Sequence, residues 1–253
     1  MKVKDLYEEY PFDHWKEYDP YDPHYAHFKS YYIYTAFKIV DVYSSFAHAR
    51  SYMNELNLED YGQAISKHDE IHLKYIRAKT IQSALAFYNY CIDLSWQVVW
   101  FNISDDTFRF IENNEYDKYA TKCDFDSLIF KLKIFKKEYL RNHLTRFKSS
   151  KLTENIRKKY NYLKHRGTFE FEGLGVIQKC SMASVNGVSL PFLRREEIDI
   201  KELETNLIEF DMLFVEYFNI LIEMTMPANF TKIKMDLFDP LTIFKKYKEC
   251  EII

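Results

Sequence analysis

A chain of 253 residues, of which 47% are hydrophobic and 29% charged, has the composition of a globular protein and not of a disordered one. At this length roughly 70–75% of the surface of the unfolded chain can be buried, so the fold does not need a disulfide bond or a bound metal ion for its stability. The formal net charge of −3 excludes a chain that is strongly basic or acidic throughout.

Cysteine spacing and hydropathy indicate where the protein resides. The four cysteines are far apart and form no Cys-x-x-Cys pair, which argues against a zinc ribbon, a thioredoxin-type motif and a secreted disulfide framework. The N-terminus lacks the apolar stretch of a signal peptide, and no run of about 18 apolar residues occurs anywhere. We therefore expect reduced thiols, a cytoplasmic location and no membrane partner.

Prolines separate an N-terminal arm from one long helical domain. Residues 1–24 contain Asp19-Pro20 and Asp22-Pro23, which are typical of turns, and we expect an irregular arm there. The domain then covers residues 25–253. No proline lies between residues 24 and 190, and because a proline inside a helix costs about 3 kcal/mol, this stretch favours continuous helices.

Three long helices are expected in that stretch. The first covers about 27–56 and the second about 65–102, where apolar residues recur at spacings of three and four. This predicted buried stripe consists of Ile71, Tyr75, Ala78, Ile81, Leu85, Tyr88, Ile92, Trp96 and Val99. After a short helical piece at 107–113, the third covers about 126–148, with an apolar face made of Leu128, Leu132, Phe135, Tyr139 and Leu144.

A further helix with clear end signals follows. Thr153 and Glu154 are typical of a helix start, and the helix is expected to reach His165 or Arg166. Gly167 stands where a helix-terminating glycine is expected.

The pattern then changes to glycine-rich sequence. Four of the five glycines lie between residues 167 and 187, and Asn186-Gly187 stands between short β-prone flanks. We expect a β-hairpin or ordered loop over 168–195. A helix over about 200–226 follows, and Asp239-Pro240 opens a short C-terminal helix within 236–250. The predicted fold class is therefore all-α: a single helical-bundle domain of five to seven helices with a small β insertion.

Positive charge is concentrated in one segment, from Lys131 to Arg166. It contains thirteen Lys or Arg against Glu138 and Glu154, a net +11, whereas the rest of the chain carries −14. Such a field attracts a polyanion to one face, and RNA is a candidate partner because neutralising phosphates releases counterions. The alternative is a solvated face that pairs with acidic segments of this chain or of a partner protein. The candidate RNA-binding residues are Lys133, Lys136, Lys137, Arg141, Arg146, Lys148, Lys159, Lys164 and Arg166.

The end of the basic segment carries residues suited to cutting RNA. At about 100° per residue, His165 lies about 40° from Asn161, 80° from Arg157 and 20° from Lys158 around one helix. A neutral imidazole can take the proton of a ribose 2′-hydroxyl, and a nearby cation can stabilise the charge that builds on the phosphate. The candidate catalytic residues are therefore His165, Arg157, Asn161 and Lys158. A histidine that only stabilises the helix C-terminus is the alternative.

This segment resembles the HEPN superfamily, all-α domains common in prokaryotic defence and toxin–antitoxin systems. The likeness rests on Arg157, Asn161, Lys164, His165 and Gly167, after long helices such as residues 87–101. It implies a metal-independent endoribonuclease without a cofactor, whose Arg–His site is usually assembled across a homodimer. Those two roles would fall on Arg157 and His165.

The sequence departs from the HEPN pattern in its spacing. Seven residues separate Arg157 from His165, more than that pattern allows. Lys158 stands at a permitted spacing, but lysine cannot grip phosphate in the bidentate manner of arginine. The alternative function is therefore a non-catalytic helical module that binds RNA or a partner protein.

Other histidines are weaker candidates for metal binding. His68 and His72 stand four residues apart with acids between them, but Glu70 is misplaced for a His-Glu-x-x-His motif. His14, His24 and His27 lie in the N-terminal arm and are expected at the surface. No metal site is predicted.

Overall fold

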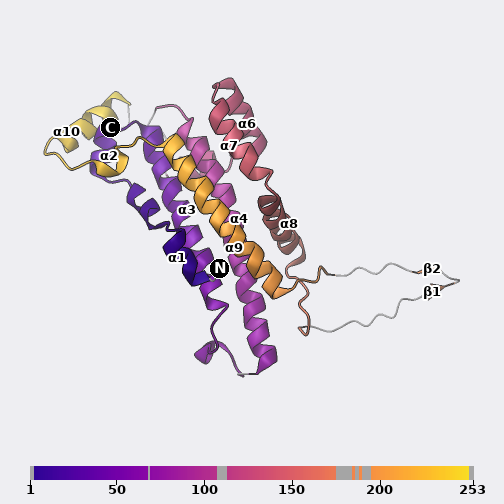
Figure 1. The fold of residues 1–253 in the computed structure, drawn as a ribbon. Helices are drawn as coiled ribbons and strands as arrows, with labels where there is room; N and C mark the ends of the chain where they lie inside the picture. Colours follow the sequence, from indigo (N-terminus) through magenta and orange to yellow (C-terminus); the bar gives the residue numbers. More distant parts are fainter. Residues whose placement is uncertain are drawn as a thin grey trace.

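The computed structural model describes residues 3–67, 69–106, 113–174, 184–185, 188–189 and 195–250. Long helices lie side by side in a bundle (Figure 1), which confirms the all-α prediction. In the described part of the chain, the strands form one antiparallel pair, β1 (Ser184–Val185) and β2 (Val188–Ser189), with Val185 opposite Val188. These strands lie on either side of residues 186–187, as the hairpin prediction requires, although those two residues and most of 175–194 lie outside the described part.

Three helices form the centre of the bundle: α3 (Ser30–Glu55), α4 (Glu70–Asn102) and α9 (Ile200–Thr225). The first two are joined through a short 3-10 turn, η3 (Gly62–Ala64). Two of the three begin at aspartates whose side chains accept backbone N–H groups, Asp69 from His72 and Asp199 from Glu202. Their facing sides are apolar and fully buried, and include Ile39, Val42, Phe46, Leu85, Tyr88, Ile92, Phe210, Phe214 and Phe218.

Most of the apolar stripe predicted for α4 is buried, but its first part is not. Ile71 and Tyr75 are exposed, which corrects the prediction for these two residues. They lie in the first turns of α4, at the lower end of the bundle in Figure 1, where few neighbouring elements cover the helix. The periodic pattern predicts which side of a helix is apolar. It does not predict how much of the length of the helix is covered by neighbouring elements.

The single helix predicted over 126–148 is two helices, α6 (Phe125–Ile134) and α7 (Glu138–Lys148). The break is a turn in which Lys136 takes a positive φ of 56°, a conformation that residues other than glycine adopt uncommonly. Because the turn resets the helical period, Phe135 and Tyr139 are exposed and not part of the apolar face, whereas Leu128, Leu132 and Leu144 are buried as expected. The helix α5 (Asn113–Ala120) precedes this pair, and residues 107–112, predicted as helical, lie outside the described part.

The helix α8 (Lys151–Arg166) follows α7 directly. Its N-cap is Ser150, whose hydroxyl accepts the Thr153 N–H at 3.2 Å, so the helix begins two residues before the predicted start at Thr153. Gly167 ends the helix with a φ of 80°, as expected for a terminating glycine. Its N–H donates to the Leu163 carbonyl at 2.7 Å.

The N-terminal arm is helical and not irregular. It forms η1 (Val3–Asp5), α1 (Leu6–Glu9), η2 (Asp13–Tyr18) and α2 (Asp22–His27). The reason is burial: the Trp15 ring is fully buried edge-on against Phe46 and Phe218, and its Nε1–H donates to Asn219 Oδ1 at 2.7 Å. The arm is therefore part of the same core as the long helices.

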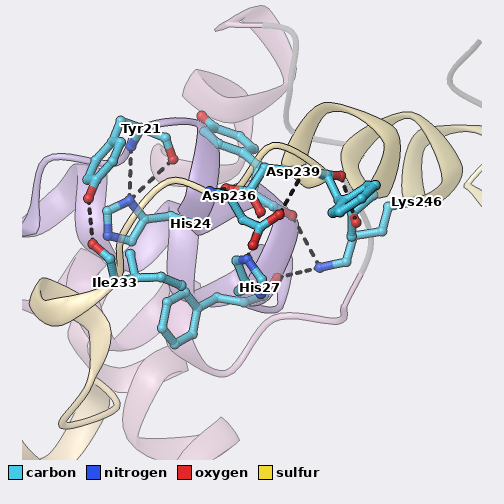
Figure 2. Close-up of polar contacts among 11 residues, drawn as sticks. Tyr21, His24, His27, Ile233, Asp236, Asp239 and Lys246 are labelled. Carbon is cyan, nitrogen blue, oxygen red and sulfur yellow. Dashed lines mark hydrogen bonds and ion pairs between the residues drawn. The ribbon is translucent and has the colours of Figure 1, made fainter.

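The C-terminal segment docks onto the arm through polar contacts (Figure 2). After η4 (Phe230–Lys232) the chain forms α10 (Asp239–Glu249), with Pro240 in its first turn as predicted. The buried Asp239 carboxylate lies 2.8 Å from His27 Nε2, and Lys246 Nζ donates to the carbonyls of Tyr25 and Phe28 at the end of α2. The C-terminal helix α10 therefore lies beside α2, at one end of the bundle (Figure 1).

A fully buried ion pair connects the arm, α3, α4 and α9. Arg50 donates from Nε and Nη2 to the two carboxylate oxygens of Asp211, at 2.8 and 2.7 Å. Arg50 Nη2 also donates to the Tyr10 carbonyl, and the Tyr88 hydroxyl donates to Asp211 Oδ2, both at 2.7 Å. Desolvation raises the pKa of Asp211, and the Arg50 guanidinium opposes this rise by favouring the carboxylate.

Single substitutions of this pair are expected to destabilise the fold more than the double substitution. Arg50→Met or Asp211→Leu alone leaves one buried charge unpaired, which costs about 3–5 kcal/mol of unfolding free energy. Arg50→Met/Asp211→Leu removes both charges and should cost less than either single change. Urea denaturation of the four proteins measures this, and a double variant that loses the sum of the two single losses would contradict the account.

Candidate nucleic-acid interface

The thirteen basic residues of the segment lie on α6, α7 and α8 and in the turn between α6 and α7. The three helices follow one another along one side of the bundle (Figure 1). α8 packs against α4 and α9, and its apolar side chains, such as the fully buried Ile156, face them. The remaining sides of α6–α8 carry the charge. These helices therefore place basic residues along that side of the bundle.

Five of these basic residues are engaged within the chain. Lys131 Nζ lies 3.4 Å from the centre of the Trp100 ring. The others form ion pairs with acidic side chains: Arg141 with Glu138, Lys148 with Asp126, Arg157 with Asp93 and Lys159 with Glu196. Arg141, Lys148 and Lys159 are among the predicted RNA-binding residues, and each forms an ion pair within the chain, as the alternative interpretation describes.

The other eight basic residues are exposed, and no ion pair to a residue in the described part of the chain involves them. We term them the basic surface; they are Lys133, Lys136, Lys137, Arg146, Lys151, Lys158, Lys164 and Arg166. Lys151 was not among the predicted RNA-binding residues. The charge of an exposed basic residue without an ion-pair partner is fully available to a bound ligand. The charge of a basic residue in an ion pair is already partly neutralised by the acidic side chain.

The outer face of α8 brings together three of the four candidate catalytic residues. Lys158, Asn161 and His165 are all exposed, as their angular positions around the helix predict. His165 lies in the last turn of α8, one residue before Arg166 of the basic surface. The arrangement offers an accessible imidazole, an amide and a cation on one side of a single helix.

Arg157, the fourth candidate, lies on the side of α8 that faces α4. Its Nη1 donates to Asp93 Oδ1 at 2.7 Å, and its guanidinium lies 4.6 Å from the centre of the Trp96 ring. Within one chain, therefore, Arg157 and His165 do not form the paired site that the HEPN resemblance implies.

Arg157 lines a pocket of about 530 Å³ that sequence reasoning missed. Its other walls are formed by Asp93, Trp96 and Gln97 of α4, by residues 120–121 and 123–126, and by Lys148 of α7. Burial raises the pKa of the Cys123 thiol in this wall to about 12, so the residue is not a thiolate at neutral pH. The pocket is assembled from residues far apart in sequence, so local patterns contain no signal for it.

The structure describes four of the five histidines considered for metal binding, and each of the four has a polar partner within the chain. His72 Nδ1 pairs with the Asp69 carboxylate at 2.7 Å, His14 with Asn219, and His27 with Asp239. His24 is buried and not at the surface as expected; its Nδ1 accepts the Tyr21 N–H and its Nε2 lies 3.1 Å from the Phe230 carbonyl. Among the residues that the structure describes, no group of three or more His, Cys, Asp or Glu could hold a metal ion; His68 is not among them.

Comparisons of the chain with protein-family models, with curated proteins and with solved structures found no match. The resemblance to the HEPN superfamily therefore stays a prediction. Within the described ranges, no helix has the length and apolar character needed to cross a lipid bilayer.

Proposed function

We propose that this chain binds RNA through the basic surface of α6, α7 and α8. The observation that supports this function is the set of eight exposed cations without an ion-pair partner in the described part of the chain. The rest of the sequence carries −14, so an RNA strand is attracted to this side and repelled elsewhere. Binding is driven by the release of counterions from the phosphates.

Pairing with acidic segments of the same chain accounts for only part of the positive charge. Four basic residues of the segment pair with Asp93, Asp126, Glu138 and Glu196, and the eight of the basic surface remain after these contacts. A nucleic acid carries phosphates at regular intervals, so cations distributed over three consecutive helices can contact several of them. RNA is therefore favoured over an internal electrostatic role.

Neutralising two lysines of the basic surface is expected to lower the salt dependence of RNA binding. For a single strand, log K falls with log salt concentration by about 0.7 for each phosphate contact, so Lys133→Gln/Lys137→Gln should reduce the slope by about 1.4. Fluorescence anisotropy with a labelled RNA at several salt concentrations measures the slope.

The matched control is Lys201→Gln/Lys232→Gln, which removes the same charge from exposed lysines on α9 and η4. It should leave the slope close to that of the unmodified protein. Equal effects of the two variants would mean that binding reflects net charge and not this surface, which contradicts the proposal.

The second proposed function is metal-independent RNA cleavage on the outer face of α8. It is supported by the exposure of His165 on the same face as Asn161 and Lys158. His165 would take the 2′-hydroxyl proton, and the oxygen would then bond to the adjacent phosphorus as the bond to the 5′-oxygen breaks and that oxygen takes up a proton. Lys158 would supply the cation, because Arg157 is held by Asp93. The defence or toxin–antitoxin role implied by the HEPN resemblance belongs to this second proposal.

On this second proposal, cleavage persists in EDTA and His165→Ala lowers its rate by at least about 100-fold, the smaller end of the effect of general-base catalysis. Because His165 is exposed, the variant should unfold at the same temperature as the parent protein. Gel analysis of labelled RNA measures the rate. A requirement for magnesium, or full activity of the variant, would show that His165 is not the base, while leaving RNA binding in place.

A further inference from the structure

Three aromatic rings are exposed where α6 turns into α7. Phe130 is 62% exposed, Phe135 54% and Tyr139 77%. Elsewhere in the bundle, aromatic rings such as those of Phe46, Phe210, Phe214 and Phe218 are fully buried. Exposed rings cost free energy in water, so three of them within ten residues mark a surface that contacts something other than water.

The local structure accounts for their outward orientation. On α6, Leu128 and Leu132 face the core, and at about 100° per residue Phe130 lies on the opposite side of the helix. Phe135 follows the last residue of α6, and the turn through Lys136 then brings Tyr139 into the first turn of α7. About 7.5 Å of helix rise and about 140° of rotation separate Phe130 from Phe135, so the two rings are attached to different sides of the same end of α6.

Three lysines of the basic surface alternate with these rings. Lys133, Lys136 and Lys137 are exposed and have no ion-pair partner in the described residues. Surfaces that bind single-stranded nucleic acid without sequence preference combine aromatic rings, on which bases stack, with cations that contact the backbone. In a duplex the base faces are covered by their neighbours, so such rings discriminate in favour of single strands.

We propose that this α6–α7 tip, formed by Phe130, Phe135 and Tyr139 with Lys133, Lys136 and Lys137, is a stacking site for unpaired bases, which makes single-stranded RNA the ligand of the basic surface. This inference rests on the proposed RNA binding and adds the class of RNA. Charge complementarity identifies the occupant: a second copy of the chain docked through the same patch would bring six lysines together, whereas an RNA strand brings phosphates.

The test compares two variants that each lose one exposed Phe and one exposed Tyr. Phe135→Ala/Tyr139→Ala removes rings from the α6–α7 tip, and Phe244→Ala/Tyr75→Ala removes similarly exposed rings from α10 and the start of α4. Anisotropy titrations use a labelled oligouridine strand and a labelled RNA duplex of the same length. All four side chains are exposed, so both variants should keep the unfolding temperature of the parent protein.

The tip variant is expected to bind oligouridine at least about tenfold more weakly, because each stacked base contributes about 1–3 kcal/mol. Its duplex affinity and its salt slope should stay close to those of the parent protein, since no charge is removed. Phe135→Tyr/Tyr139→Phe keeps both rings and should restore oligouridine binding, whereas Phe135→Leu/Tyr139→Leu keeps apolar area without rings and should not.

Unchanged oligouridine binding by the tip variant, with weakened binding by Lys133→Gln/Lys137→Gln, would overturn the stacking site and leave RNA binding intact. Restoration of binding by the leucine variant would also overturn it, because the contact would then be generally apolar, as in docking to a protein. If neither the lysine nor the aromatic variant changes RNA affinity, both the proposed function and this inference are wrong.

Discussion

The architecture depends on one buried ion pair in the apolar interior of the bundle, because both of its charges need hydrogen-bond partners there. Arg50 and Asp211 are fully buried, and desolvating each charge costs several kcal/mol unless it finds a partner with good geometry. The bidentate contact, the Tyr88 hydroxyl and the Tyr10 carbonyl supply that geometry from α3, α4, α9 and the N-terminal arm at once. A shift of any one of these four elements along the bundle would break a buried charged hydrogen bond, so their register is fixed.

The position of α4, which this ion pair fixes, in turn determines how α8 of the candidate interface is oriented. With α4 held by Tyr88, the carboxylate of Asp93 and the ring of Trp96 lie little more than one and two turns further along the helix. Arg157 of α8 binds both, and Ile156 beside it is buried. These contacts set the rotation of α8, so Lys158, Asn161 and His165 face solvent. The contacts that α8 makes with the bundle therefore determine which side of α8 faces solvent.

Local sequence signals predicted the elements that depend on local chemistry. The absence of proline gave the long helices, Gly167 marked the end of α8, and Asn186-Gly187 gave the position of the strand pair. The concentration of basic residues likewise identified the segment that forms the candidate interface. Each of these signals acts within a few residues of its effect.

Features that depend on distant partners were not predictable in this way. The pairing of Arg157 with Asp93 was missed because the two residues are 64 positions apart in the sequence. The arm looked irregular because Trp15 is anchored by Asn219, on a helix at the other end of the chain. The turn at Lys136 carries no glycine, so one helix was predicted where there are two, and the exposed rings of Phe135 and Tyr139 were assigned to its apolar face.

We propose that α6, α7 and α8 form the RNA-binding side of this protein. Amide hydrogen–deuterium exchange of the full chain, with and without saturating single-stranded RNA, tests it most directly. The account predicts slower exchange across residues 125–166 and unchanged exchange in α3, α9 and α10. Protection centred on α10, or no protection at an RNA concentration that saturates binding, would contradict it.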